Sequence, residues 1–318
     1  MQVAICICTF KRRELLAKLL RGVSELTFPK ATVPEITIVV VDNDTARSAE
    51  EVCLAAPQRW PIKYAVEPRR NMATIRNRAV LEAGNVDFVA LLDDDEVPTP
   101  QWLDELLAVQ AKFQADVVSG PVSPVFAADT AEWIRTGGFF DRPRFATGHV
   151  MDKCSTNNVL VRREVFARAR HFEEGMQLTG VEDTHFFMRV KQAGYKIVWS
   201  DGALVRETVP AVRANLRWLL ARGYRLGNTW VLCELSLDRR WRTRALRAVK
   251  ACAWVARGLA TAATAPFTGK AGAVRGLRTA LYGVGEITAL AGQKYQEYKS
   301  AWMDPVDRPA ASADVSAS

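Results

Sequence analysis

Residues 3–14 read VAICICTFKRRE, an apolar run of strand-forming residues that changes at once into a polar, basic segment. Four later apolar, β-branched runs have the same character, at 36–41, 62–66, 88–92 and 117–119. Segments of helical spacing or composition separate the runs, at 13–23, 46–55, 72–84 and 100–113. Strands that alternate with helices predict an α/β fold, a largely parallel, Rossmann-like sheet with helices on both faces.

Ligands of such sheets bind beyond the carboxyl ends of the strands. Three of these loops carry polar or charged residues directly after an apolar run, at 9–13, 42–45 and 93–98. We therefore expect the three loops to meet at one ligand site. Residues 120–154 are rich in glycine, proline and aromatic side chains and predict an irregular connection.

The acidic run Asp93-Asp94-Asp95-Glu96 directly follows the apolar residues Leu91 and Leu92. Four adjacent carboxylates repel one another unless a cation or a donor-rich ligand offsets their charge. Carboxylates at this density suit Mg²⁺ or Mn²⁺ bound to a diphosphate. A solvated acidic turn before the helix expected near residue 100 is the alternative.

A second acidic corner, VVVDND at residues 39–44, ends the earlier apolar run at 36–41. A carboxylate there can accept the imide N–H of uracil. Asp and Asn also cap helices in any turn between a strand and a helix. From this corner alone, the helix cap is the favoured interpretation.

Residues 67–78, EPRRNMATIRNR, form a basic loop that runs into a helix. Such a helix start suits an anionic diphosphate, although an exposed basic helix start would look the same. Farther along, Glu182 and Asp183 open an amphipathic helix. Asp183 is a candidate general base for an acceptor hydroxyl, and a helix cap is the alternative.

In this order the segments resemble family 2 glycosyltransferases of the GT-A fold over about residues 3–230. The matching segments are VAICICTFKRRE (3–14), VVVDND (39–44), NMATIRN (71–77), LLDDDE (91–96), STNNVLVRRE (155–164) and GVEDTHFFMRVKQAGYKI (180–197). Within the family the sequence is most similar to bacterial exopolysaccharide glucosyltransferases of the succinoglycan type. They share the EDT-x-FF run and the pattern VPxxRxxLxWLxxRxxRxG, here at 209–227.

The resemblance implies roles for individual residues. Asp183 would be the catalytic base of an inverting transfer, and Glu182 would orient the base or the acceptor. Asp93 and Asp95 would hold Mn²⁺ or Mg²⁺. The donor would contact Thr9, Phe10, Arg12, Asp42, Asp44, Asn71, Arg76, Asp93, Asp94 and Arg206. The acceptor would contact Asn157, Asn158, Arg222 and Arg225.

Two positions depart from the family pattern. Ile75 stands where the family usually has alanine, which changes packing. Arg206 stands where close relatives have a metal-binding histidine. Arginine does not ligate a metal but can neutralise a diphosphate, so we expect Arg206 to take over part of the work of the metal.

The carboxy-terminal third is strongly basic. Residues 211–300 carry 16 Lys and Arg against 4 Asp and Glu, although the whole chain has a net charge of only +8. On a helical projection of residues 240–260, basic residues share an arc with Trp254, and the rest of the projection is apolar. Basic amphipathic helices of this kind suit the surface of an anionic membrane. Nucleic acid is not the expected partner, because no recognisable binding module is present.

These observations predict a GT-A catalytic domain at 1–230, a basic amphipathic helical region at 231–303 that associates with a membrane, and a disordered tail at 304–318. The expected activity moves a sugar, glucose from UDP-glucose, to a lipid-linked oligosaccharide or glycolipid in bacterial cell-surface polysaccharide synthesis. A polyprenyl phosphate acceptor is the alternative. A non-catalytic sugar-nucleotide-binding or membrane-scaffold protein is a more distant one.

The expected location is peripheral, on the cytoplasmic face of the inner membrane. The six cysteines are scattered without zinc or disulfide spacing, which favours reduced thiols. No apolar run reaches the length of about 18 residues that a spanning helix needs. A sugar nucleotidyltransferase or a dinucleotide dehydrogenase needs a glycine-rich loop after the first strand. Residues 8–13 contain no glycine, which counts against both enzyme classes.

Overall fold

The computed structural model describes residues 1–57, 59–176 and 180–295. The expected tail at 304–318 and residues 296–303 of the expected helical region lie outside the described residues. The expected domain boundary at residue 230 falls inside one continuous helix, α8 (Leu216–Leu237).

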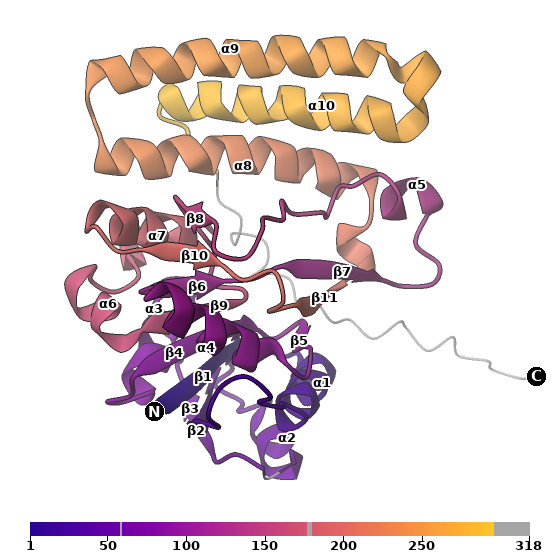
Figure 1. Ribbon diagram of the computed structural model, residues 1–318. Coiled ribbons are helices and arrows are strands. Elements are labelled where there is room, and N and C mark those ends of the chain that lie inside the picture. Colours follow the sequence, from indigo (N-terminus) through magenta and orange to yellow (C-terminus); the bar gives the residue numbers. More distant parts are fainter. Residues whose placement is uncertain (58, 177–179, 296–318) are drawn as a thin grey trace, which may run out of the picture.

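A sheet of eight strands forms the centre of the molecule, in the order β3-β2-β1-β4-β9-β6-β10-β8 (Figure 1). Its strands are β1 (Gln2–Thr9), β2 (Glu35–Asp42), β3 (Ile62–Val66), β4 (Phe88–Asp93), β6 (Val117–Ser119), β8 (Val150–Met151), β9 (Val159–Arg162) and β10 (Ile197–Trp199). The first four strands are parallel, and β9 runs antiparallel to both β4 and β6. All five predicted strands are confirmed, with ends that differ by at most one residue.

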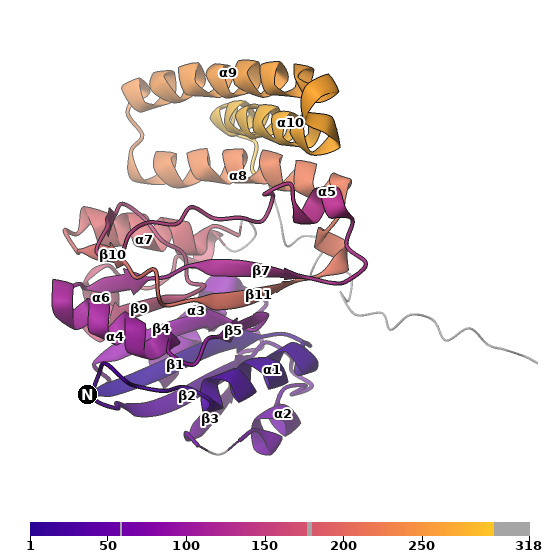
Figure 2. The ribbon, with the colours of Figure 1, turned by 45° about the vertical axis from the view of Figure 1, so that its right-hand side comes forward.

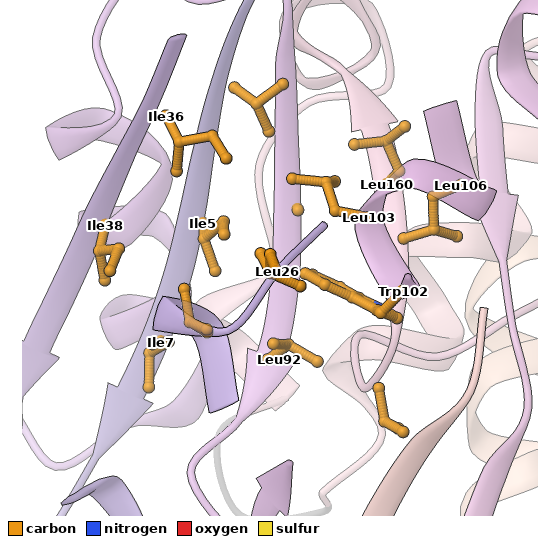
Figure 3. Packing of buried hydrophobic residues seen from close by; sticks show 14 of the residues in the cluster. Ile5, Ile7, Leu26, Ile36, Ile38, Leu92, Trp102, Leu103, Leu106 and Leu160 are labelled. Carbon is orange, nitrogen blue, oxygen red and sulfur yellow. The ribbon is translucent and has the colours of Figure 1, made fainter. Parts of the chain in front are cut away.

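Helices cover both faces of the sheet, as predicted. The helices are α1 (Arg13–Ser24), α2 (Glu50–Ala55) and α4 (Trp102–Phe113) on one face, and α3 (Met72–Glu82), α6 (Arg163–Arg168) and α7 (Glu182–Gln192) on the other. Alternate strand residues enter the two cores because side chains along a strand point to opposite faces. Ile5 and Ile7 pack with Trp102 and Leu106 of α4 in the first core (Figure 3), whereas Ala4 and Cys6 belong to the second.

The parallel register aligns the ends of three strands. Thr9 pairs with Asp42 across β1 and β2, and Cys8 pairs with Asp93 across β1 and β4. The loops after these strands therefore emerge at one edge of the sheet, as the sequence predicted.

A second sheet of three strands lies beside this edge, in the order β5-β11-β7. Its strands are β5 (Glu96–Pro98), β7 (Val122–Phe126) and β11 (Val205–Val209). The prediction that residues 120–154 are irregular was wrong in part, because β7, the short helix α5 (Glu132–Arg135) and β8 lie within them. Two 3₁₀ turns complete the described elements, η1 (Glu174–Met176) and η2 (Ala211–Arg213).

Three long helices form a layer above the α/β part of the chain (Figures 1 and 2). They are α8, α9 (Trp241–Ala263) and α10 (Ala265–Leu290), and α10 lies between the other two. Glycines let the helices approach closely: a Cβ added at Gly227 of α8 would lie 1.9 Å from the carbonyl oxygen of Tyr282. α9 is the outermost helix, on the far side of the layer from the sheet.

A small apolar cluster fixes this layer to the α/β part of the chain. Phe139 and Phe140, from the segment after α5, pack with Val209 of β11, Leu219 of α8 and Val274 of α10. None of the described helices holds a stretch long and apolar enough to cross a membrane.

Candidate active site

The edge of the sheet where β1 and β4 end carries a network of acids and arginines. Thr9 donates a hydrogen bond from Oγ1 to Oδ2 of Asp94 over 2.8 Å. Arg12, in the loop before α1, reaches Oδ1 of Asp94 over 2.8 Å and Oδ2 of Asp95 over 3.2 Å. These contacts fix the acidic run against the first loop, so two separately predicted segments form one site.

Asp95 is a buried acid among like charges. Burial raises its pKa, and the carboxylates of Asp93 and Asp94 raise it further, to about 7. Arg12 and Arg213 partly oppose this shift, and the Nη1 atom of Arg213 lies 3.6 Å from Oδ2 of Asp95. At neutral pH the carboxyl therefore exchanges its proton readily, and added positive charge would favour its ionised form.

Arg76 of α3 joins the acidic run to the start of α7. Its guanidinium pairs with Glu182 and lies 3.6 Å from Oδ1 of Asp93. Burial opposes the charge of Arg76, but Glu182, Asp93 and Asp183 outweigh it and raise the arginine pKa. The acids of α7 and the acids after β4 thus face the same guanidinium.

Asp183 lies in the first turn of α7 and is half-buried. Oδ1 of its carboxylate accepts hydrogen bonds from the backbone N–H and the hydroxyl of its neighbour Thr184. Glu182 is buried, and its Oε2 atom has no hydrogen-bond partner among the described residues. Burial raises the pKa of Glu182 against the opposing charge of Arg76.

β11 contributes a further acid to the site. Glu207 pairs in register with Glu96 of β5, so both side chains are on the same face of the small sheet. Glu207 accepts a hydrogen bond from Nη2 of Arg142 over 2.8 Å and lies 3.7 Å from Nη1 of Arg213. Burial, Asp93 and Glu207 together raise the pKa of Glu96 well above its ordinary value.

Arg206 is placed differently from the expectation. It precedes Glu207 on β11, so its side chain is on the opposite face of the strand, and it is exposed. Among the described residues no hydrogen bond or ion pair joins Arg206 to the acids of the site. Arg213 stands beside Asp95 instead.

Asp42, Asp44 and Asn71 shape the two neighbouring turns. Asp42 is fully buried and accepts hydrogen bonds from the backbone of Asp44 and Ala49 and from the Tyr64 hydroxyl. Oδ1 of Asp44 accepts from the backbone N–H of Ala46. Asn71 caps α3, where its Oδ1 accepts from Ala73 over 3.0 Å. Asn71 therefore caps its helix, whereas the side chains of Asp42 and Asp44 hold the turn before α2, which has no side-chain cap.

The expectation that Asn158 contacts an acceptor is not met. Asn158 is fully buried, and its side chain accepts from the Trp102 indole over 2.7 Å and donates to the carbonyls of Pro121 and Ala203 over 2.8 and 2.7 Å. These bonds join α4 to the loops before β7 and β11, so the residue is structural. Asn157 is also buried, beside it in the chain.

The remaining predicted site residues lie in two places. Phe10 follows β1 at this edge, and Arg222 and Arg225 lie on α8 of the helical layer. Phe10 packs under the charged ends of Lys11 and Arg70, with the guanidinium of Arg70 5.6 Å from the ring centre. Arg222 lies on α8 over the rings of Trp218 and Phe140. Arg225 follows one turn later on the same helix.

Three residues of the site had no predicted role: Arg142, Glu207 and Arg213. Arg213 stands in the VPxxR part of the sequence pattern, which was a signal without an assigned function. Glu207 and Arg142 join the site through pairings between distant segments, which local patterns do not reveal.

A surface hollow lined in part by Met1, Asp87 and Arg163 lies at the amino ends of β1 and β4. This is the edge opposite the acids, so the hollow does not mark the candidate site.

Comparison with known proteins gives concordant matches. A family model described as glycosyl transferase family 2 matches residues 4–169, and one described as glycosyl transferase family group 2 matches residues 88–291. The succinoglycan biosynthesis protein ExoM of Rhizobium meliloti is 33% identical over 232 residues, which cover 72% of this chain and 74% of ExoM. The glycosyltransferase AglE of Haloferax volcanii is 22% identical over 74% of this chain and 77% of its own.

Solved structures share the fold. TarS of S. aureus, residues 1–349 in complex with UDP-GlcNAc, superposes with a TM-score of 0.53 at 14% identity over 93% of each chain. GalNAc-T7 with UDP, GalNAc and Mn²⁺ superposes with a TM-score of 0.52 at 13% identity, over 73% of this chain and 50% of its own. These matches confirm the predicted GT-A fold.

Proposed function

Because this chain belongs to glycosyl transferase family 2, we propose that it transfers a sugar from a UDP-sugar to a lipid-linked saccharide, with Asp183 as the base. That the chain is a glycosyltransferase follows from its family. UDP-glucose as the donor, the acceptor class and inversion at the anomeric carbon are the proposed parts. A polyprenyl phosphate acceptor is the alternative.

One observation carries the proposal. Arg76 contacts Asp93 on one side and Glu182 on the other, so the loop after β4 and the start of α7 belong to one chemical site. A single-displacement transfer needs a group that holds the leaving diphosphate and a carboxylate on the other side of the anomeric carbon. The contacts of Arg76 support this division between the Asp93 side and the Asp183 side.

Solved structures with a similar fold support a nucleotide-sugar donor and a metal. One was solved with UDP-GlcNAc and another with UDP and Mn²⁺. The described residues include no group of three or more His, Cys, Asp and Glu that could hold a metal alone. Mg²⁺-type sites often use one or two carboxylates plus substrate phosphates, and Asp93 and Asp95 fit this pattern with their hard oxygen donors and the raised pKa of Asp95. Mn²⁺ or Mg²⁺ held there would supply positive charge to the leaving diphosphate.

The chain's own residues would carry out the remaining steps. Asp183 accepts the proton of the acceptor hydroxyl while that oxygen forms a bond to the anomeric carbon. The bond between the anomeric carbon and the diphosphate oxygen breaks, and its electron pair leaves with UDP. Glu182, held by Arg76, fixes the start of α7 and so orients Asp183. Arg12 and Arg76 present positive charge on the donor side of the site.

The acceptor proposal rests on the name of a relative and on the outer helix. ExoM is described as a succinoglycan biosynthesis protein, and we place this chain in similar synthesis of a cell-surface polysaccharide, at the cytoplasmic face of the membrane. α9 turns an apolar face outward: Trp241 is 73% exposed and Val249 69% exposed, with Leu246 and Leu259 also exposed. Exposed Arg242, Lys250 and Arg257 lie on the same helix.

This outward face suits the interface of an anionic bilayer. Apolar side chains would enter the headgroup region while the basic residues pair with anionic lipid. The single sign of charge disfavours a second copy of the chain on this face.

The change Asp183→Asn tests the base role. We expect UDP, in the presence of Mn²⁺, to raise the melting temperature of wild type and variant equally. Turnover of UDP-glucose, followed as UDP release, should fall about 10²- to 10⁴-fold, the usual contribution of a general base.

The change Glu25→Gln, at an exposed carboxylate after α1, is the control and should change neither quantity. Undiminished turnover in Asp183→Asn would remove Asp183 from the base role. If no nucleoside diphosphate stabilises the wild-type protein, the donor proposal fails.

A further inference from the structure

Arginines from three segments gather where the helical layer meets the α/β part of the chain. Arg142 comes from the segment after α5, Arg222 from α8 and Arg278 from α10. Arg278 donates to the carbonyl oxygen of Phe139 over 2.8 Å, and Arg142 pairs with Glu207 over 2.8 Å. The arginines are thus held in place by contacts with neighbouring segments.

Arg222 makes no ion pair with an acid among the described residues, although Glu207 lies near enough to act on its charge. Its guanidinium lies 5.1 Å from the ring centre of Trp218 and 5.6 Å from that of Phe140, and the two rings stack 5.6 Å apart. Its Nε atom is buried and makes no hydrogen bond to any described residue. The aromatic rings attract the guanidinium through their π faces but carry no net charge.

Such an arrangement is unfavourable in the absence of an anion. Burial lowers the pKa of Arg222, and Arg278, Arg142 and Arg225 lower it further, to about 9. A buried charge without a partner destabilises a fold, and replacing it is often neutral or stabilising. Arginine also presents a planar set of donors that matches phosphate.

The cluster adjoins the candidate active site. Arg142 pairs with Glu207, and Glu207 lies 3.7 Å from Arg213, which in turn lies beside Asp95. On the other side the cluster contacts α8 and α10, the inner helices of the layer whose outer face is α9 (Figure 2). It therefore lies between the sugar-transfer site and the surface that we assign to the membrane.

We propose that Arg142, Arg222 and Arg278 bind the phosphate group that links the acceptor saccharide to its lipid. This inference rests on the proposed function and names the chemical group by which the acceptor is recognised. The donor diphosphate is assigned to the opposite side of Glu207, near Arg12, Arg76 and Asp93. Two separate cationic sites would let one enzyme hold two phosphate-bearing substrates at once.

The test uses the full chain and geranyl diphosphate, a short prenyl diphosphate, with EDTA present so that no metal assists binding. We expect Arg222→Gln and, separately, Arg278→Gln to weaken the binding of geranyl diphosphate about 10- to 100-fold, as for the loss of a hydrogen bond to a charged group. UDP binding with Mn²⁺ should stay unchanged in both variants. Arg217→Gln, at an exposed arginine of the same helix, is the matched control and should change neither affinity.

The outcomes separate the alternatives. If the variants bind UDP and geranyl diphosphate equally weakly, the cluster belongs to the donor site. If they bind geranyl diphosphate as tightly as the wild type does, the cluster is not an anion site. Either result overturns the inference. The melting temperature of ligand-free Arg222→Gln should be equal to or above that of the wild type, whereas a lower one would indicate a packing role and count against the proposal. Failure of the wild type to bind UDP would remove the proposed function but not the result for the anion site.

Discussion

Asp95 shows how single residues of the site depend on charge from outside their own segment. It is buried beside Asp93 and Asp94, and its positive neighbours come from the loop before α1 and from η2. In the folded chain its carboxyl keeps a proton up to about pH 7, whereas an unfolded chain loses that proton near pH ~4. Raising the pH through this window therefore favours unfolding of the ligand-free protein.

The same shift makes metal binding depend on pH. A divalent cation needs the ionised carboxylate, so we expect the apparent affinity for Mn²⁺ in the presence of UDP to weaken up to about tenfold per pH unit below pH 7. Calorimetric titration at pH 6, 7 and 8 measures this. In Asp95→Asn the weakened affinity should vary little over that range. If the variant keeps the wild-type pH dependence, another group controls the site.

The sequence indicated the acidic run but not its neighbours. Asp93 to Glu96 are adjacent in the chain, so their mutual repulsion can be inferred from local sequence. Glu207 reaches Glu96 only through the pairing of β5 with β11, which joins segments more than a hundred residues apart. Arg206 was chosen because it aligned with a family ligand, but the pleat of β11 turns it away from Glu207.

At the scale of elements, the parallel half of the sheet was predictable and the small sheet was not. β1, β2 and β4 are largely buried apolar runs, β3 is a short apolar run at the edge of the sheet, and helices separate them, so each is visible locally. β5 has three residues, and β7 has five with Pro124 in its middle, where proline disfavours a strand, so neither gives a strong local signal. Asn158, whose backbone has a φ of 74°, joins α4 to the loops before β7 and β11 through its side chain, a role that its sequence position does not reveal.

The three-helix layer depends on glycines at the helix contacts. An added Cβ at Gly227 would meet the Tyr282 carbonyl oxygen at 1.9 Å, which is a backbone atom that cannot simply rotate away. We expect Gly227→Ala to lower the free energy of unfolding by about 1–3 kcal/mol, the usual effect of overpacking. Urea denaturation followed by fluorescence measures the change.

Gly175→Ala is the control, because a Cβ there would meet only the flexible side chain of Glu173, at 3.4 Å. Its stability should match that of the wild type. Equal stability of Gly227→Ala would mean that α8 and α10 are not in such close contact.

Three chemically different regions follow one another in space, from the edge of the sheet to the outermost helix. The acids at the edge of the sheet lie next to Glu207, and the arginines follow at the base of the helical layer. α9, whose outward face is apolar, is the outermost helix (Figure 1). The sequence identified a basic and an apolar arc on α9 but not their orientation. Arg247 turns inward to pair with Glu234 and Glu286, so much of the apolar arc is left facing outward.

This orientation predicts how the protein binds membranes. Val249→Asp and Leu259→Asp place a negative charge within the exposed apolar face, where it would be repelled by anionic lipid and would disfavour burial of the helix at the interface. We expect each variant to lose most of its flotation with vesicles that contain phosphatidylglycerol, while its melting temperature is unchanged.

Leu54→Asp, at an apolar residue of α2 that is 76% exposed, introduces the same charge elsewhere and should float like the wild type. Flotation with neutral vesicles should be weaker for all proteins. If Val249→Asp floats normally but alters the mass measured by light scattering, the face of α9 binds a second copy of the chain and the membrane assignment is wrong.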